Sequence, residues 1–190
     1  GGATAELVGG EVEGGREGGA ATTRGWDTQV GAHAEGGADD TRLFFSGVDR
    51  AEWHPFGVRL DPVTGARTDL GGTVYMVSRD GRWAASADLT KMHLTQKGYG
   101  VHIPPEAIQT NTGAPDDDGV FVTDTATGQA QLVLSLARIV EEAEPAIDRD
   151  AFADGDFYAF HVKWTVDGSR LMVVVRWRPH GDVARPKLRN

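Results

Sequence analysis

A short basic stretch holds the residues best suited to chemistry. No acidic residue occurs between Asp88 and Glu106, yet two lysines and two histidines do, with Gln96 and Tyr99 among them: Lys91, His93, Lys97 and His102. In a chain with a formal charge of −9, this local positive charge would attract an anion. We expect an acidic sugar, with the cations pairing with its carboxylate and Tyr99 stacking on a pyranose face.

The same stretch offers candidates for catalysis. A lysine, a histidine or a tyrosine can act as the base of an elimination reaction, and Lys91, His93 and Tyr99 are the candidates. Lys97 and His102 are the candidates for binding the substrate. The alternative is a solvated loop whose polar side chains have no task, because most surface loops carry none.

The elements that must position these residues are β-hairpins of two kinds. Apolar and polar residues alternate on both sides of Asp80-Gly81 and of Asp167-Gly168, and a degraded copy surrounds Asp39-Asp40. Asp-Gly tolerates the positive φ angles of a tight hairpin turn, so each of these stretches predicts two antiparallel strands.

The second kind of hairpin turns at Asp-x-x-Thr-Gly. It occurs at Asp61–Gly65 and Asp124–Gly128, and the N-terminus matches its second half. The two kinds alternate. Asp40 and Gly81 are 41 residues apart, the length of a four-stranded propeller blade, and Gly81 and Gly168 are 87 apart, roughly one blade plus two insertions. We therefore predict an all-β fold, a β-propeller of four-stranded antiparallel blades.

The alternation also predicts the organisation of the chain. Blades are expected at about 26–70 and 73–136, an incomplete one at 159–190, and a Gly-rich linker at 9–25. Because about three blades do not close a ring, we expect a fragment of a longer ring or a chain that depends on a partner. Leu89–Gly119 is expected to be a loop-like insertion, and a short helix should begin after Ser135 and end at Pro145.

Several motifs carry a resemblance to a known family. The turn pairs resemble those of bacterial TolB-like β-propellers, and within that group the chain resembles sugar-associated propellers of the oligogalacturonate-lyase-like kind. The residues that carry it are Trp26–Gly31, Ser78–Trp83, Lys97–Gly100, Asp116–Gly119 and the stretch from His161 to Trp177. The resemblance implies a metal that is held by His and Gln side chains and neutralises a uronate carboxylate, and a basic residue that removes the neighbouring proton.

Further candidates follow from placing the remaining residues on a propeller. His161 opens a predicted strand, so it is a candidate metal ligand with Gln29 for a divalent metal, Mn or Ca; the alternative is a structural histidine. Arg176 and Trp177 alternate faces at a strand end, so one would line the channel and bind substrate while the other packs. Two acidic clusters match no calcium loop and are expected to be solvated turns: Asp116–Asp118 and Asp148, Asp150, Asp154 and Asp156.

Composition excludes some classes of function. The chain has no cysteine, so it forms no disulfide and no thiolate metal site, and the compartment stays undecided. Its acidic balance argues against a nucleic-acid partner, and no apolar run is long enough to span a membrane. The resemblance, together with the basic stretch, implies a carbohydrate-active or carbohydrate-binding propeller, with an oligogalacturonate-lyase-like enzyme as its catalytic form. The alternative is a non-catalytic propeller that serves as a scaffold for a protein partner.

Overall fold

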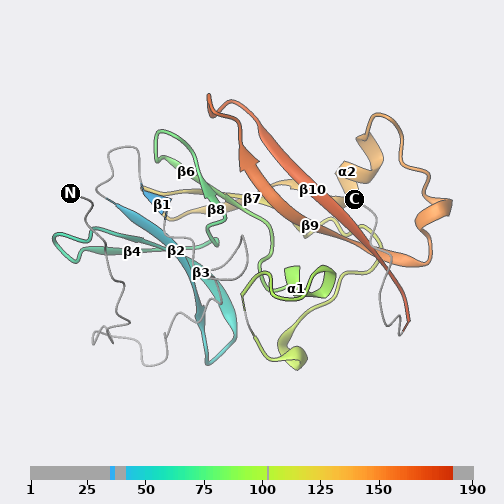
Figure 1. The fold of residues 1–190 in the computed structure, drawn as a ribbon, viewed down its shortest axis with the longest axis horizontal. Helices are drawn as coiled ribbons and strands as arrows, with labels where there is room; N and C mark the ends of the chain where they lie inside the picture. The colour runs from blue at the N-terminus through green and yellow to red at the C-terminus, as the bar shows by residue number, and fades with distance from the viewer. Residues whose placement is uncertain (1–34, 37–41, 102, 182–190) are drawn as a thin grey trace.

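In the part of the chain that the structure describes, the strands form two four-stranded antiparallel sheets and one two-stranded sheet. The structure, a computed structural model, describes residues 35–36, 42–101 and 103–181 (Figure 1). Predictions that concern Gln29, His102, the linker at 9–25 and the start of the first blade lie outside the described residues. In the first sheet each strand pairs with the next along the chain: β1 (Glu35–Gly36), β2 (Leu43–Asp49), β3 (His54–Leu60) and β4 (Arg67–Leu70).

The second sheet repeats this order, and the third has two strands. The second contains β5 (Met76–Val77), β6 (Trp83–Ser86), β7 (Gly119–Asp124) and β8 (Ala130–Ser135). The third pairs β9 (Gly155–Trp164) with β10 (Leu171–Pro179). The all-β prediction is therefore confirmed, with every described strand pair antiparallel. None of the described sheets closes on itself.

The Asp-Gly turns are stabilised by a hydroxyl two residues before the aspartate. Ser78 donates to the Asp80 carboxylate at 2.6 Å and accepts from the Trp83 amide at 3.0 Å. Thr165 does the same with Asp167 and with the Arg170 amide. A positive φ at the following glycine completes each turn. The sequence motif that predicts this turn is therefore Ser/Thr-x-Asp-Gly, which is more specific than Asp-Gly alone.

The Asp-x-x-Thr-Gly turns are built alike in the first two sheets. The Asp61 carboxylate accepts from the amides of Val63 and Thr64 at 2.8 and 3.0 Å. In the second sheet, Asp124 accepts from the two equivalent amides at the same distances. The short aspartate side chain accepts hydrogen bonds from the amides of its own turn and so fixes the register of the hairpin. Both turns therefore form hairpins, as the sequence predicts.

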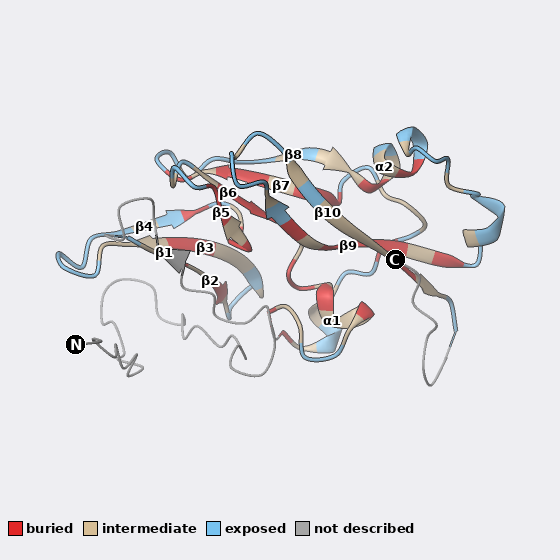
Figure 2. Ribbon diagram, turned by 45° about the horizontal axis from the view of Figure 1, so that its top comes forward, coloured by how far each residue is buried: buried red, intermediate tan, exposed pale blue. Residues whose placement is uncertain are grey.

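The larger of two buried clusters among the described residues lies between the second and third sheets. β9 packs against β5, β6 and β7, and Figure 2 shows buried residues on β6, β9 and α1 (Met92–Thr95) facing this layer. Phe160 and Val162 of β9 and Ala84 and Ala85 of β6 are almost fully buried. Because neighbours on a strand face opposite sides, Ala85 joins the cluster that includes β9, whereas Ala84 joins a second cluster with Phe44 and Leu70 of the first sheet. The second sheet is therefore buried on both faces.

The insertion at 89–119 is largely irregular, as expected, but it is not the solvated loop that the sequence left open as the alternative. It contains α1 and a 3₁₀ helix at Pro105–Ala107, and Met92 of α1 is 0% exposed. Leu89, Val101 and Ile103 belong to the same buried cluster. The sequence did not reveal this burial, because the apolar side chains of the insertion lie among polar ones with neither helical nor strand spacing. They become buried through their packing with β9.

The helix predicted after Ser135 is confirmed. α2 spans Leu136–Glu142, and the Ser135 hydroxyl accepts from the Arg138 amide at 3.2 Å. Leu136 and Val140, one turn apart, are its buried residues, and the helix ends before Pro145. A second 3₁₀ helix follows at Asp150–Phe152 and leads into β9.

Candidate functional site

Lys91 lies in a nearly buried network of polar groups. Its ammonium donates to Asn111 Oδ1 at 2.8 Å and to Asp118 Oδ2 at 3.0 Å, and Asp88 lies 3.5 Å away. Burial by itself would lower the pKa of Lys91, but the carboxylates of Asp118 and Asp88 outweigh it and raise the pKa above its ordinary value. A lysine held charged in this way is a poor proton acceptor at neutral pH, so its geometry favours a structural role over the predicted catalytic one.

The same network corrects the prediction for the first acidic cluster. Asp116 and Asp117 are exposed, as expected of a solvated turn, but Asp118 is only 3% exposed. Its carboxylate accepts from Asn111 Nδ2 at 2.8 Å and from the Gly119 amide at 2.7 Å. A buried carboxylate needs such partners, and they are supplied here by residues that the local sequence does not bring together.

Most of the second acidic cluster is solvated, as predicted. Asp148, Asp150 and Asp154 are exposed. Asp156 differs, because its carboxylate accepts from the Gly113 amide at 2.7 Å and contacts His180 Nε2 at 3.0 Å. This aspartate therefore holds the insertion against the start of β9.

The remaining candidates meet at a group of side chains between α1, β9 and β10, which we call the aromatic–arginine cluster. It consists of Tyr75, Gln96, Tyr99, Phe160, His161 and Arg176. The Arg176 guanidinium lies 3.6 Å from the centre of the Phe160 ring and donates to Gln96 Oε1 at 2.6 Å. Both contacts fix the plane of the guanidinium, which is the part of the residue that recognises carboxylates.

Aromatic rings surround His161 in this cluster. Its ring centre is 4.4 Å from that of Phe160, 5.8 Å from that of Tyr75 and 6.1 Å from that of Tyr99. Burial, helped by the charges of Arg176 and Lys163, lowers the pKa of His161, so its imidazole is neutral at neutral pH. Its buried Nε2 has no hydrogen-bond partner among the described residues.

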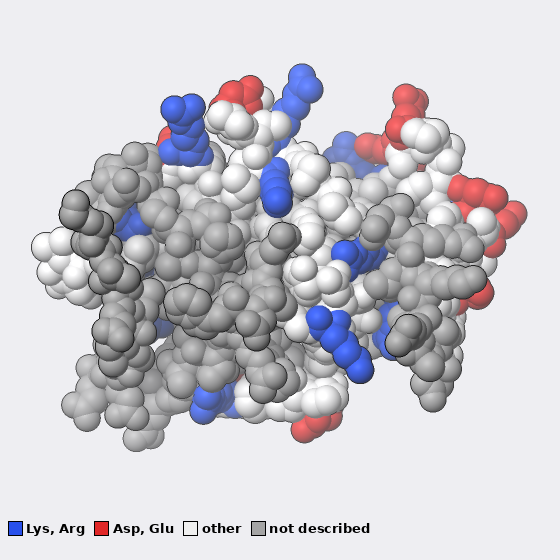
Figure 3. All heavy atoms as spheres, viewed as in Figure 1, with Lys and Arg blue, Asp and Glu red and all other residues white. Residues whose placement is uncertain are grey.

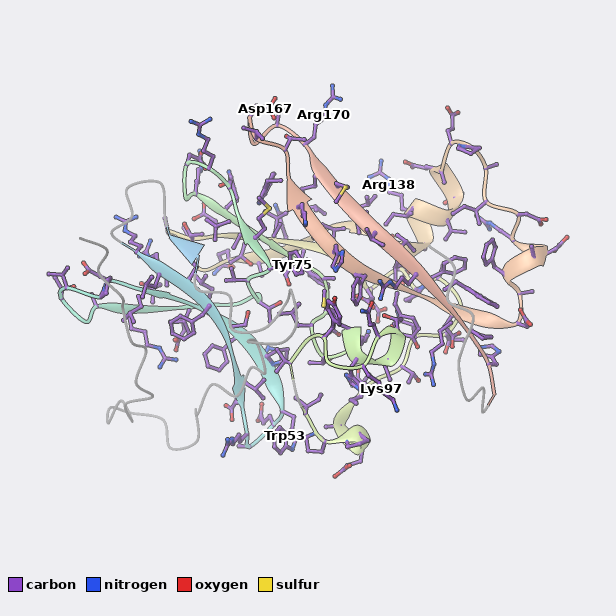
Figure 4. All side chains as sticks on the ribbon, viewed as in Figure 1. Trp53, Tyr75, Lys97, Arg138, Asp167 and Arg170 are labelled. Carbon is purple, nitrogen blue, oxygen red and sulfur yellow. The ribbon has the colours of Figure 1, made fainter. Side chains whose placement is uncertain are left out.

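The cluster therefore brings together some of the predicted site residues. Tyr99 and His161 are neighbours, and Arg176 joins them from β10. His93 is half-buried on α1, which packs against β9, and Lys97 is exposed just after this helix (Figure 4). Figure 3 shows Lys and Arg atoms on this face, with Asp and Glu atoms gathered mainly at its margins.

Arg176 and Trp177 point to opposite faces of β10, as neighbours on a strand do. Trp177 is buried, donates from Nε1 to the Phe152 carbonyl at 3.1 Å and meets the Phe152 ring edge-on. Only Arg176 points to the cluster, so Trp177 supports the strand and is not placed to touch a substrate there. Asn111 and Gln96 had not been predicted as partners, since they act across 46 and 80 residues of chain.

The structure provides no further support for the metal prediction. In the stretches 42–101 and 103–181 no three His, Asp or Glu side chains converge as a metal site would require. The proposed second ligand, Gln29, lies outside those stretches, so a site shared with His161 stays a prediction.

A shallow depression of about 450 Å³ lies near the opposite end of the molecule. It is bounded by the turn between β9 and β10 and by one residue from the turn between β5 and β6: Arg79, Thr165, Val166, Asp167, Ser169 and Arg170. Figure 4 shows Asp167 and Arg170 at the end of the hairpin remote from Lys97. Because Asp167 is engaged by its own turn, the aromatic–arginine cluster is the better candidate site.

Comparison with known proteins adds no relative. No family model matches the chain, and no curated protein or solved structure is significantly similar to it. Among the described helices, none is long and apolar enough to cross a bilayer.

Proposed function

We propose that this chain is a β-propeller-type protein that binds an acidic carbohydrate at the aromatic–arginine cluster. Support for the propeller comes from two successive four-stranded meanders followed by a hairpin that packs face to face on the second of them. The Asp-Gly turns of β5–β6 and β9–β10 match each other in geometry, and so do the Asp-x-x-Thr-Gly turns of β3–β4 and β7–β8. Repetition of one packed unit along a chain is the principle of propeller architecture.

The single observation that carries the binding proposal is the held guanidinium of Arg176. Phe160 supports its face and Gln96 its edge, so little side-chain freedom is lost when it pairs with a carboxylate. Tyr99 lies beside Phe160, at 5.1 Å between ring centres, and is partly exposed. A planar cation next to a partly exposed aromatic ring suits a uronate, which has a carboxylate on an otherwise apolar ring face.

Lys97 extends the same surface. It is exposed directly after α1, and the preceding residue, Gln96, is the one bonded to Arg176. A chain of uronates carries one carboxylate per sugar ring, so a second cation close to the first would favour an oligosaccharide over a single sugar. His102 belongs to this expected surface but lies outside the described residues.

One observation favours a catalytic form of the proposal. The lowered pKa of His161 leaves a neutral imidazole beside a cation, which is the arrangement of a base next to a group that neutralises a carboxylate. Elimination from a uronate requires that pair of groups. The two partly buried residues best placed for it are His161 and Arg176, with Tyr99 adjacent.

Calorimetric titration of the full chain with acidic and neutral oligosaccharides of equal length tests the binding proposal. Arg176→Met, His161→Ala and Lys97→Ala should each weaken binding of the acidic ligand by about 1–3 kcal/mol, the range for a lost charge-assisted hydrogen bond. Arg170→Met is the matched control, because this arginine directly precedes the same strand at its far end. Thermal unfolding of each variant separates lost binding from lost folding.

Two outcomes would contradict the proposal. If Arg176→Met binds the acidic ligand as the parent does, the site lies elsewhere. If the parent binds no sugar, the scaffold alternative takes its place. For the catalytic form, incubation with an oligogalacturonate should generate the ultraviolet absorbance of an unsaturated product in the parent and not in His161→Ala.

A further inference from the structure

Three polar side chains of the insertion contact one another in a closed, nearly dry triangle. The Lys91 ammonium donates to Asn111 Oδ1 at 2.8 Å and to Asp118 Oδ2 at 3.0 Å. Asn111 Nδ2 donates to the same Asp118 oxygen at 2.8 Å. The Lys91 side chain is 12% exposed, Asn111 is 6% exposed and Asp118 is 3% exposed. One carboxylate oxygen therefore lies within hydrogen-bond distance of both an amine nitrogen and an amide nitrogen, away from bulk water.

The hydrogen bonds of Asn111 show which atom of its amide faces the lysine. Its Nδ2 also donates to the Phe157 carbonyl at 2.7 Å, so this nitrogen faces two groups that only accept. An amide turned the other way would oppose its oxygen to both of them and its nitrogen to the ammonium. The carbonyl therefore faces Lys91, and since a C=O bond is about 1.2 Å long, Cγ of Asn111 lies within about 4 Å of Nζ. That is close to the separation of about 3–3.5 Å from which a nucleophile attacks.

Asp118 also lies where a group must lie to move protons between the two nitrogens. Lysine attacks a carbonyl only as a neutral amine, and this carboxylate can take its proton. The transfer converts two buried charges into two neutral groups, which burial favours. Asp88, 3.5 Å from Nζ and with a side chain 26% exposed, opposes the transfer because it stabilises the ammonium. The neutral pair is therefore a minor form, so a reaction through it is slow and goes to completion only if one product leaves.

We propose that Lys91 and Asn111 become joined by an isopeptide bond, which the chain forms by itself with Asp118 as the acid–base group. Asp118 takes one proton from the ammonium, and the freed lone pair of Nζ forms a bond to Asn111 Cγ. The carboxyl group then relays a second proton from Nζ to Nδ2. The Cγ–Nδ2 bond breaks with its electron pair on the departing nitrogen, and ammonia leaves, taking up the first proton as ammonium. No atom is oxidised or reduced, and the reaction needs no co-reactant.

The bond fastens the segment that carries part of the aromatic–arginine cluster. Lys91 and Asn111 are 20 residues apart, and α1, Gln96 and Tyr99 lie between them. Joining the two side chains closes this segment into a covalent loop, which lowers the conformational entropy of the unfolded chain. This proposal does not depend on sugar binding, since none of the three reacting side chains belongs to the cluster.

Mass spectrometry of the denatured full chain tests the proposal. We expect a mass below that of the sequence by one ammonia. Trypsin should not cut after Lys91, so digestion should give a branched peptide in which residues 83–97 are joined to residues 98–138. Fragmentation of that peptide should locate the bond between the side chains of Lys91 and Asn111. Far-UV circular dichroism checks that the chain was folded before it was denatured.

Two variants and their matched controls identify the groups that react. Lys91→Arg keeps a cation but offers no amine, so it should not lose ammonia. Asp118→Asn should form the bond at least about a hundredfold more slowly after cell-free synthesis, because general acid–base catalysis contributes that much or more. Lys163→Arg and Asp117→Asn change exposed residues of the same types and should lose ammonia as the parent does. Should a variant at the buried triangle fail to fold, the branched peptide of the parent still decides the question.

Three results would overturn the proposal. A folded parent that keeps its full mass on prolonged incubation at neutral pH would show that the triangle is a hydrogen-bonded network only. Loss of ammonia without a branched peptide would instead indicate a cyclic imide at an asparagine. An undiminished rate in folded Asp118→Asn would remove the acid–base group and, with it, the mechanism.

Discussion

Removing either charge of the Lys91–Asp118 pair should destabilise the fold strongly, whereas removing both should cost little more than removing one. The Lys91 and Asp118 side chains are 12% and 5% exposed, so each variant strands a charge away from water. Breaking a buried pair typically costs about 3–5 kcal/mol. We expect the lower end of that range, because each remaining charge keeps other partners: Asp88 and Asn111 for Lys91, and Asn111 and the Gly119 amide for Asp118.

The assay is a double-mutant cycle in urea with Lys91→Met, Asp118→Asn and the double variant. Each single change should lower the free energy of unfolding by about 3 kcal/mol, and the double change should lower it by no more than about the same amount. Simple additivity of the two losses would refute the buried pair. A loss below about 1 kcal/mol for Lys91→Met would do so too, and would return Lys91 to the catalytic candidates.

Three further changes test the packing and the titrating groups. Met92→Ala should lower the free energy of unfolding, measured in urea, by about 2–5 kcal/mol, because the residue is 0% exposed. Lys97→Ala on the same segment should change that free energy by less than about 0.5 kcal/mol, because Lys97 is exposed. Equal effects of the two changes would contradict the burial of α1. The lowered pKa of His161 means that the unfolded chain binds a proton that the fold resists, so stability should fall as pH drops below the ordinary pKa of 6.5, and His161→Gln should flatten that part of the profile. Hydrogen bonds from Thr165 and Ser169 lower the pKa of Asp167 from 3.8 to about 2. The stabilising contribution of this carboxylate is therefore complete above pH 3.8 and is lost as the pH falls towards 2. The urea midpoints of the parent and of Asp167→Asn should converge over that pH interval.

The sequence was most informative where structure depends on neighbouring residues. Turns such as Asp124–Gly128 close within a few residues, so the strands on both sides and their antiparallel pairing could be predicted. The helix after Ser135 was predictable for the same reason, since its cap and its two buried residues lie within one short segment. Local sequence patterns predict which residues form a strand, turn or helix, and this prediction does not depend on how the element is packed in the fold.

The site was less predictable because its partners are distant in sequence. One residue of the basic stretch, Tyr99, lies beside His161, but the sequence pattern could not distinguish Lys91, which is turned inward, from Lys97, which is exposed. That difference depends on Asp118, whose burial arises only when β7 and β9 are in place. The role of Gln96 depends on Arg176 in the same way. The charge pattern therefore indicated a candidate region, and only the tertiary contacts show which of its side chains are turned inward.

The hydrogen bonds of the Asn111 side chain affect which parts of the protein unfold together. Its side chain donates to the Phe157 carbonyl in β9 at 2.7 Å and, at the same time, to Asp118 at the base of β7. The insertion is thereby fastened to two sheets at once, so opening it requires that β9 loosen as well. Local unfolding should then involve the insertion and the third sheet as one cooperative unit, with a common free energy of opening. A ligand at the aromatic–arginine cluster, which spans both parts, would stabilise that whole unit and slow its exchange with solvent throughout.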